Sequence, residues 1–146
     1  MLSILQFLAS ISSGLFAGAA LYITLVEHPV RSLLDTRAAA SQWAPSYQRA
    51  TWMQAPLAII ALLSGLAACL LGAGFGWLLC ALLIGAVVPI TFTIIMPTNQ
   101  QLLDPARDLS SAETRALLDR WGRLHALRTA MSLLAFAGFV CLSYAR

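Results

Sequence analysis

The sequence has very little charge for its length. Only 10% of its 146 residues are Asp, Glu, Lys or Arg, and 60% are hydrophobic. A soluble domain carries about 25% charged residues, so this chain cannot cover an ordinary water-facing surface. Lysine is absent, because all nine basic residues are Arg. The net charge of +3 is small and mixed with acidic residues, which argues against the basic surface that binds nucleic acid.

Paired cysteines and the common catalytic motifs are also missing. Cys69, Cys80 and Cys141 each lie inside an apolar stretch and form no C-x-x-C pair, so we expect free thiols. The chain has no G-x-S-x-G, no phosphate-binding P-loop and no H-E-x-x-H sequence. The hydrolase, nucleotide-binding and zinc-protease signatures are therefore excluded.

Four apolar stretches are each long enough to cross a bilayer as a helix, which needs roughly 20 residues. They cover residues 3–26, 52–72, 76–96 and 126–145, and Arg128 is the one charged residue inside them. A backbone in hydrocarbon has to satisfy its own hydrogen bonds, so these stretches predict helices. The first lacks the positively charged start of a signal peptide. The fold class is predicted to be all-α, with residues 1–146 forming one integral membrane four-helix bundle.

The fourth helix is predicted to begin before its apolar stretch and to run over residues 111–145. Ser110 and Glu113 have the spacing of a capping box, in which each side chain bonds a free N–H at the start of a helix. One stripe at helical spacing contains Leu117, Trp121, Leu124, His125 and Arg128. The N-terminal half of this helix is therefore predicted to be an amphipathic extension.

The connections between the helices predict an orientation. Residues 73–75 join the second and third helices, whereas 27–51 and 97–125 are long. With four spans both long connections fall on one side, and that side holds eight of the nine Arg. The positive-inside rule places them in the cytoplasm and both termini outside. We expect a protein of a bacterial inner membrane.

Polar residues gather at the membrane face that carries the long connections. They are Glu27, His28, Arg31, Tyr47, Arg49, Gln54, Pro97, Thr98, Asn99, Gln100, Trp121, His125 and Arg128. Ionisable groups near membrane depth are costly and tend to be paired or functional, which favours a site here. Simpler roles stay open: a Glu27–Arg31 salt bridge, an Arg128 that snorkels to the interface, and an aromatic belt.

Two further interpretations are left open. Pro89 removes a backbone hydrogen bond to the Gly85 carbonyl and predicts a kink, which either widens a cavity or is simply tolerated. A metal site is possible from Glu27, His28 and His125, which supply two histidines and one carboxylate. Neighbouring Glu and His side chains point in different directions on a helix, so this set is the less favoured one.

At these positions the sequence resembles a known family. The segments Glu27-His28-Pro29, Pro97-Thr98-Asn99 and Trp121 to Arg128 (WGRLHALR) are similar to those of the anthrone oxygenase family, and the resemblance covers nearly the whole chain. Such proteins are small four-helix membrane proteins. The resemblance implies oxidation of the central methylene of an anthrone by O₂ without an evident cofactor. It also implies that the site is lined by His125, Trp121, Arg128, Asn99, Glu27 and His28.

We therefore predict a cofactor-independent monooxygenase that acts with O₂ on a lipophilic anthrone-, phenol- or quinol-like substrate. The predicted catalytic residues are His125 as base, because an unperturbed histidine has a pKa of about 6.5, and Arg128 and Asn99 as stabilisers of an oxyanion. The predicted substrate-binding residues are Trp121, Glu27, His28, Tyr47 and Gln54. The alternatives are a binding or transport protein without catalysis, a structural membrane protein and a metal-dependent membrane oxidoreductase.

Overall fold

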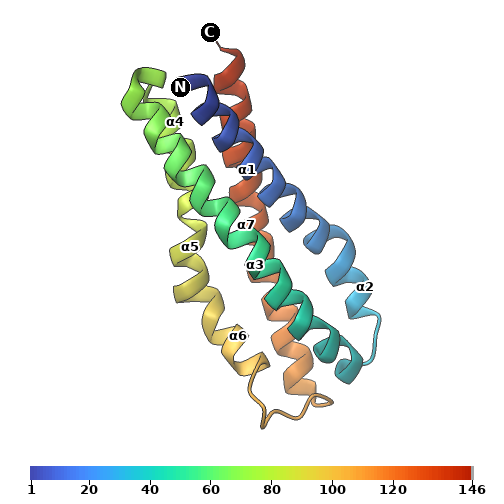
Figure 1. The fold of residues 1–146 in the computed structure, drawn as a ribbon. Coiled ribbons are helices and arrows are strands. Elements are labelled where there is room, and N and C mark those ends of the chain that lie inside the picture. The colour runs from blue at the N-terminus through green and yellow to red at the C-terminus, as the bar shows by residue number, and fades with distance from the viewer. Residues whose placement is uncertain (146) are drawn as a thin grey trace.

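The computed structural model describes residues 1–145, and over that range the chain forms four long helical stretches and no β-strand. They run over Leu2–Ser32, Thr36–Ala73, Phe75–Leu102 and Ala112–Tyr144, and each is long and apolar enough to cross a membrane. Figure 1 shows the stretches side by side, with the two termini at one end and the two longer connections at the other. The predicted four-helix membrane bundle is confirmed.

The first stretch is not one regular helix. Helix α1 (Leu2–Tyr22) passes into the π-helical turn η1 (Ile23–Glu27), which continues as the short helix α2 (His28–Ser32). A π-helical turn contains one residue more than an α-helical turn and often occurs at functional sites. The extra residue changes the direction in which the following side chains point. It therefore decides which neighbours Thr24 and Glu27 can reach.

The second stretch begins much earlier than its apolar segment. Helix α3 (Thr36–Ala68) is capped by Asp35, whose side chain accepts a hydrogen bond of 3.0 Å from the Ala38 N–H. Residues 27–51 were expected to form a connection, but only the short turn before Thr36 is not helical. The reason is that this polar segment still buries Ala39 and Trp43 against the bundle.

A tight turn joins the second and third stretches. Helix α3 is followed by η2 (Cys69–Ala73), and helix α4 (Phe75–Gly85) begins directly afterwards. Gly72 and Gly74 have φ angles of +89° and +101°, a region that favours glycine because a Cβ is unfavourable there. This turn makes α3 and α4 antiparallel, as the short connection predicted.

The third stretch is broken near Pro89. After α4 the chain continues as α5 (Val87–Ile90), the π-helical turn η3 (Thr91–Ile95) and α6 (Met96–Leu102). The α-helical pattern is interrupted at Ala86. Pro89, three residues later, has no N–H to donate to the Gly85 carbonyl, so one hydrogen bond of the helix is lost here. The Thr91 and Thr93 hydroxyls donate to the carbonyls of Val87 and Pro89 at 2.7 and 2.8 Å.

The fourth stretch is the single helix α7 (Ala112–Tyr144). Its cap is Ser111, whose side chain accepts from the Thr114 N–H at 3.1 Å, so the capping box expected at Ser110 is one residue too early. The Ser110 N–H instead donates to the Asp108 side chain, which holds Ser110 in the preceding turn. With 33 residues, α7 is about 50 Å long. It therefore exceeds the roughly 30 Å hydrocarbon core of a bilayer.

The interior contains two hydrophobic clusters. The first lies in the half of the bundle near the termini and includes Phe16, Trp77 and Phe139. The second includes Trp43 and Trp121 and lies toward the two longer connections. The polar side chains of the predicted site lie beside this second cluster, at the end of the bundle where α7 is amphipathic.

Candidate functional site

His125 lies inside the bundle, with 3% of its surface exposed. Its Nδ1 atom is 3.1 Å from Thr24 Oγ1, and that oxygen is 2.7 Å from Thr129 Oγ1. The Thr129 hydroxyl also lies 3.2 Å from the carbonyl oxygens of Ala20 and His125. The π-helical turn η1 thus carries Thr24 to the face of the helix that packs on α7.

Donor counting gives this chain of hydrogen bonds a direction. A carbonyl oxygen only accepts, so the one hydroxyl hydrogen of Thr129 satisfies the carbonyl contacts. Thr24 then donates to Thr129, and the Nδ1–H of His125 donates to Thr24. If Thr129 instead donated its hydrogen to Thr24, the contacts of Thr129 with the Ala20 and His125 carbonyls would have no hydrogen. A neutral imidazole with its hydrogen on Nδ1 has a lone pair on Nε2, and no residue in 1–145 hydrogen-bonds to that nitrogen.

Arg128 follows His125 by one turn of α7 and is 9% exposed. Its Nη2 atom donates to Gln54 Oε1 at 2.9 Å, and its guanidinium lies 5.6 Å from the ring centre of Phe16. Its Nε has no hydrogen-bond partner, and within residues 1–145 no carboxylate lies within ion-pair distance of it. Arg128 therefore does not snorkel to the interface. A buried cation without a counter-charge is costly, and it is suited to a negative charge that forms on a ligand.

Trp121 is 4% exposed and is surrounded by other rings. The indole centroid lies 4.9 Å from the His125 ring, 5.5 Å from the His28 ring and 5.7 Å from the Trp43 ring. Gly122 makes room for His28, because a Cβ at this position would lie 2.5 Å from the His28 Cδ2 atom. Trp121 and Trp43 are thus packed within the bundle and are not part of a lipid-facing belt, whereas Trp52, the other tryptophan considered for such a belt, is 79% exposed.

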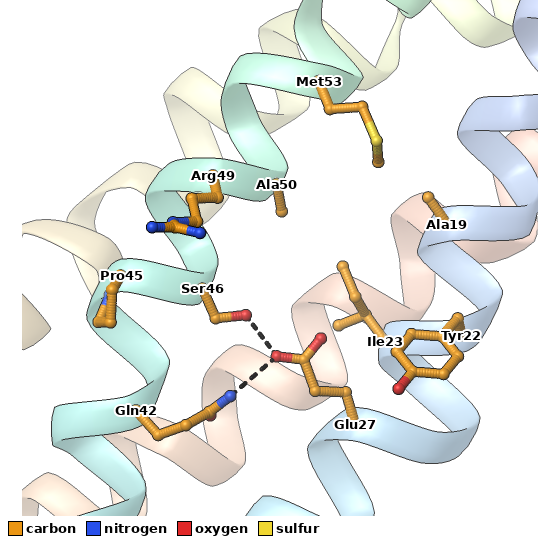
Figure 2. A pocket seen from close by; sticks show the side chains of 10 residues that line it. All are labelled: Ala19, Tyr22, Ile23, Glu27, Gln42, Pro45, Ser46, Arg49, Ala50 and Met53. Atoms are coloured by element: carbon orange, nitrogen blue, oxygen red, sulfur yellow. Dashed lines mark hydrogen bonds between the residues drawn. The ribbon is translucent and has the colours of Figure 1, made fainter.

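Glu27 and Arg31 form an ion pair of 2.5 Å, as one of the simpler interpretations expected. The same carboxylate oxygen, Oε1, also accepts from the Ser46 hydroxyl and from Gln42 Nε2, the latter at 3.2 Å. Figure 2 shows Glu27 between η1 and α3, with both of these hydrogen bonds. No residue in the described range hydrogen-bonds to the other oxygen, Oε2.

Asn99 is completely buried and donates from Nδ2 to the Tyr47 hydroxyl at 3.1 Å. Because Tyr47 accepts this hydrogen bond, its own hydroxyl hydrogen stays available to a further acceptor. The Tyr47 ring stacks on Trp43 with a centroid distance of 5.0 Å and an interplanar angle of 7°. Asn99 is therefore connected to the site through Tyr47.

A small enclosed space lies at the centre of these residues, and we call it the inner cavity. Its volume is about 10 Å³, close to the space that one water molecule needs. The lining residues are Ile23, Ser46, Tyr47, Ala50, Thr51, Gln54, Trp121, His125 and Arg128. His125 and Arg128 thus face a space for a very small molecule.

Two larger spaces adjoin the inner cavity on different sides. The lateral groove, about 590 Å³, is lined by Ala19, Tyr22, Ile23, Glu27, Gln42, Pro45, Ser46, Arg49, Ala50 and Met53 (Figure 2). It shares Ile23, Ser46 and Ala50 with the inner cavity. A second crevice of about 90 Å³ lies between α3 and the broken third stretch and shares Tyr47, Thr51 and Arg128 with the inner cavity.

The predicted site residues are thus brought together in part. Those that line the inner cavity are Trp121, His125, Arg128, Tyr47 and Gln54. Glu27 lines the lateral groove, His28 touches Trp121 from outside the cavity, and Asn99 lies behind Tyr47. Across residues 1–145, no three His, Cys, Asp or Glu side chains are placed to share a metal ion. The alternative set of Glu27, His28 and His125 is therefore not assembled.

Five polar residues of the site were not predicted from the sequence: Thr24, Gln42, Ser46, Thr51 and Thr129. Thr24 sits in an apolar stretch, and 101 positions separate it from His125. Its one signal was a hydroxyl close to the polar end of that stretch. Gln42 and Ser46 lie in the segment that was expected to be a connection.

The fold and the site together define a class: a small four-helix membrane protein with a buried histidine and arginine beside a groove in its side. A comparison with known families matches residues 43–138 to anthrone oxygenase. The chain belongs to this family, so the predicted family is confirmed. The matched range includes Tyr47, Asn99, His125 and Arg128, and it begins after Glu27 and His28. No curated protein and no solved structure matches the chain.

Proposed function

We propose that this protein is a membrane-embedded oxygenase that uses O₂, without a cofactor, on a lipophilic anthrone-, phenol- or quinol-like molecule. The observation that carries the proposal is the pairing of two features at the inner cavity. One is the His125 Nε2 lone pair, which is what a general base needs. The other is the guanidinium of Arg128, which has no counter-charge. Membership of the family supports the substrate class.

The proposed reaction begins with loss of a proton. A carbanion or phenolate gives an electron to O₂ far more readily than the neutral molecule does. His125 Nε2 takes a proton from the central methylene, and the negative charge that develops on the substrate oxygen is stabilised by Arg128. The Tyr47 hydroxyl, which accepts from Asn99, is the second donor. Asn99 then acts through Tyr47 and not on the substrate itself.

The atoms and electrons balance without a further reactant. A carbon–oxygen bond forms between the methylene carbon and one oxygen of O₂. The oxygen–oxygen bond then breaks, and the second oxygen leaves as water with the two methylene hydrogens. The products are a quinone carbonyl and one water molecule. All the electrons that reduce O₂ come from the substrate, which is why no cofactor is needed in this scheme.

The size of the inner cavity limits what can enter it. About 10 Å³ admits a molecule of the size of water but not a whole three-ring substrate. The proposal therefore requires only the reacting edge of the substrate to enter this space and reach His125 and Arg128. The packed bundle around this space also keeps bulk water away from the reactive intermediate. Transport is less well supported, because the half of the bundle near the termini is filled by the first hydrophobic cluster, including Phe16, Trp77 and Phe139.

Replacement of His125 by Gln tests this function. With anthrone and purified protein, O₂ uptake and anthraquinone formation should fall at least about 100-fold, the usual contribution of a general base. Ser143→Ala, at the far end of the same helix, should keep full turnover, because the one hydrogen bond of the Ser143 side chain among described residues goes to the Phe139 carbonyl. Normal turnover by His125→Gln contradicts the proposal. So does wild-type turnover that a chelator abolishes and iron or copper restores.

A further inference from the structure

We infer that the lateral groove is the place where a flat, hydroxylated aromatic molecule binds after it enters from the side of the bundle. In this arrangement Glu27 Oε2 accepts a hydrogen bond from a ligand hydroxyl. The identity of the ligand class rests on the proposed function. The position of the binding site rests on the geometry of the groove.

The first argument is size. The inner cavity, at about 10 Å³, holds no aromatic molecule, and the second crevice has only about 90 Å³. The lateral groove has about 590 Å³, within the roughly 300–1,000 Å³ of typical ligand pockets. Of these three spaces, it alone is large enough for a three-ring molecule.

The second argument is continuity with His125. Ile23, Ser46 and Ala50 line the groove on one side and the inner cavity on the other. These three residues form the neck between the two spaces. A ligand in the groove therefore lies against the space that His125 and Arg128 line. Its reactive carbon can meet O₂ at the neck.

The third argument is the distribution of polar groups in the groove. Ala19, Ile23 and Met53 supply apolar walls, while Glu27 and Arg49 mark the polar end (Figure 2). Glu27 Oε1 already accepts from Arg31, Gln42 and Ser46. Its other oxygen is turned away from Ser46 and Gln42 in Figure 2. An ionised carboxylate is acceptor-only, so its partner has to be a donor such as a phenolic hydroxyl.

The composition of the groove also favours a rigid phenolic substrate over a lipid chain. Its apolar part belongs to the membrane-spanning stretches, so an occupant reaches it directly from the bilayer. A hydrocarbon chain fills the apolar part, but a lipid meets Glu27 Oε2 only if a donor of its separate headgroup also reaches the polar end. A flat phenol satisfies both the apolar walls and the free carboxylate oxygen.

Binding of two unreactive probes tests this site. The probes are a hydroxyanthraquinone and anthraquinone itself. Their binding to the purified protein is measured by the quenching of its tryptophan fluorescence. Ala50→Leu fills the neck and should weaken both probes at least tenfold. Ala55→Leu is the matched control, because Ala55 lines the second crevice and not the groove. It should change neither affinity more than about twofold.

Glu27→Gln tests the hydrogen bond. It should weaken the hydroxylated probe roughly tenfold or more and leave anthraquinone unaffected. Because this change also weakens the pair with Arg31, its thermal unfolding is measured, and the comparison of the two probes is made within the same variant. Equal wild-type affinity for both probes overturns the role of Glu27. Native mass spectrometry shows which bound molecules are lost in Ala50→Leu. If phospholipid is the only molecule lost, the groove is a lipid site and the substrate site is rejected.

The outcomes separate this inference from the proposed function, because binding is measured without turnover. If wild-type protein does not oxidise anthrone while the probes remain sensitive to Ala50→Leu, the groove stands and the oxygenase fails. If anthrone is oxidised and Ala50→Leu changes neither turnover nor probe affinity, the groove is rejected and the oxygenase stands.

Discussion

The hydroxyl of Thr24 is predicted to keep the His125 base in its working tautomer. Thr24→Val removes the hydroxyl and preserves the branched shape of the side chain. The Nδ1–H of His125 then loses the acceptor that lies 3.1 Å away. A buried donor without a partner costs about 1–3 kcal/mol. Without the Thr24 hydroxyl neither ring nitrogen has a partner among residues 1–145, so the Nδ1–H form loses its advantage. Part of the His125 population then carries its hydrogen on Nε2, where it blocks the base.

The magnitude follows from that loss of preference. When neither nitrogen has a partner the two tautomers have similar energies, so kcat should fall about two- to fivefold in Thr24→Val. KM should change little, because Thr24 lines neither the lateral groove nor the inner cavity. Thr24→Ser restores the hydroxyl and should recover most of kcat.

Two assays decide the matter. Steady-state O₂ uptake gives kcat and KM for both variants, and nitrogen NMR of ¹⁵N-labelled histidine gives the position of the imidazole hydrogen. We expect Nδ1–H for His125 in the wild-type protein and a mixture of Nδ1–H and Nε2–H in Thr24→Val. Equal losses of kcat in Thr24→Ser and Thr24→Val refute the reasoning. An Nε2–H signal from His125 in the wild type refutes it as well.

Further predictions concern packing, charge and orientation. Gly122→Ala should lower the free energy of unfolding by about 1–3 kcal/mol, measured by denaturation, since its Cβ would lie 2.5 Å from His28 Cδ2. Arg128→Met should reduce kcat roughly 100-fold or more in the O₂-uptake assay, and near-normal turnover would show that no oxyanion meets this side chain. A reporter enzyme that works only outside the cytoplasm should be active when it is fused to the C-terminus. Activity of a cytoplasmic reporter at that position would show that the orientation is the opposite one.

The bundle was predictable because hydropathy and length act locally. Each apolar stretch has to be helical in hydrocarbon whatever its neighbours are. The helix over residues 36–51 was not predictable in this way. Gln42, Ser46 and Arg49 resemble a solvated connection in the sequence, and only the fold shows that they form the polar end of a groove.

The candidate site was predictable where its residues share one helix. Trp121, His125 and Arg128 fall on one stripe of α7 at helical spacing, and all three are buried. The partners from other helices depend on how each helix is rotated about its axis. The extra residue of the turn η1 rotates the following side chains by about 100°. The directions of Glu27 and His28 therefore could not be derived from a regular helix.

Three buried polar atoms without a partner among the described residues lie at the inner cavity or next to it. Buried polar groups in native proteins are nearly always hydrogen-bonded, and each exception costs about 1–3 kcal/mol. Gln54 Nε2, Arg128 Nε and Asn99 Oδ1 are buried without partners. Gln54 and Arg128 line the inner cavity, and Asn99 reaches it through Tyr47. Two of these atoms are donors beside one cavity, so the molecule that satisfies them has to supply acceptors. An oxyanion formed at the neck of the groove would do so, and this requirement limits the ligands that the site can stabilise.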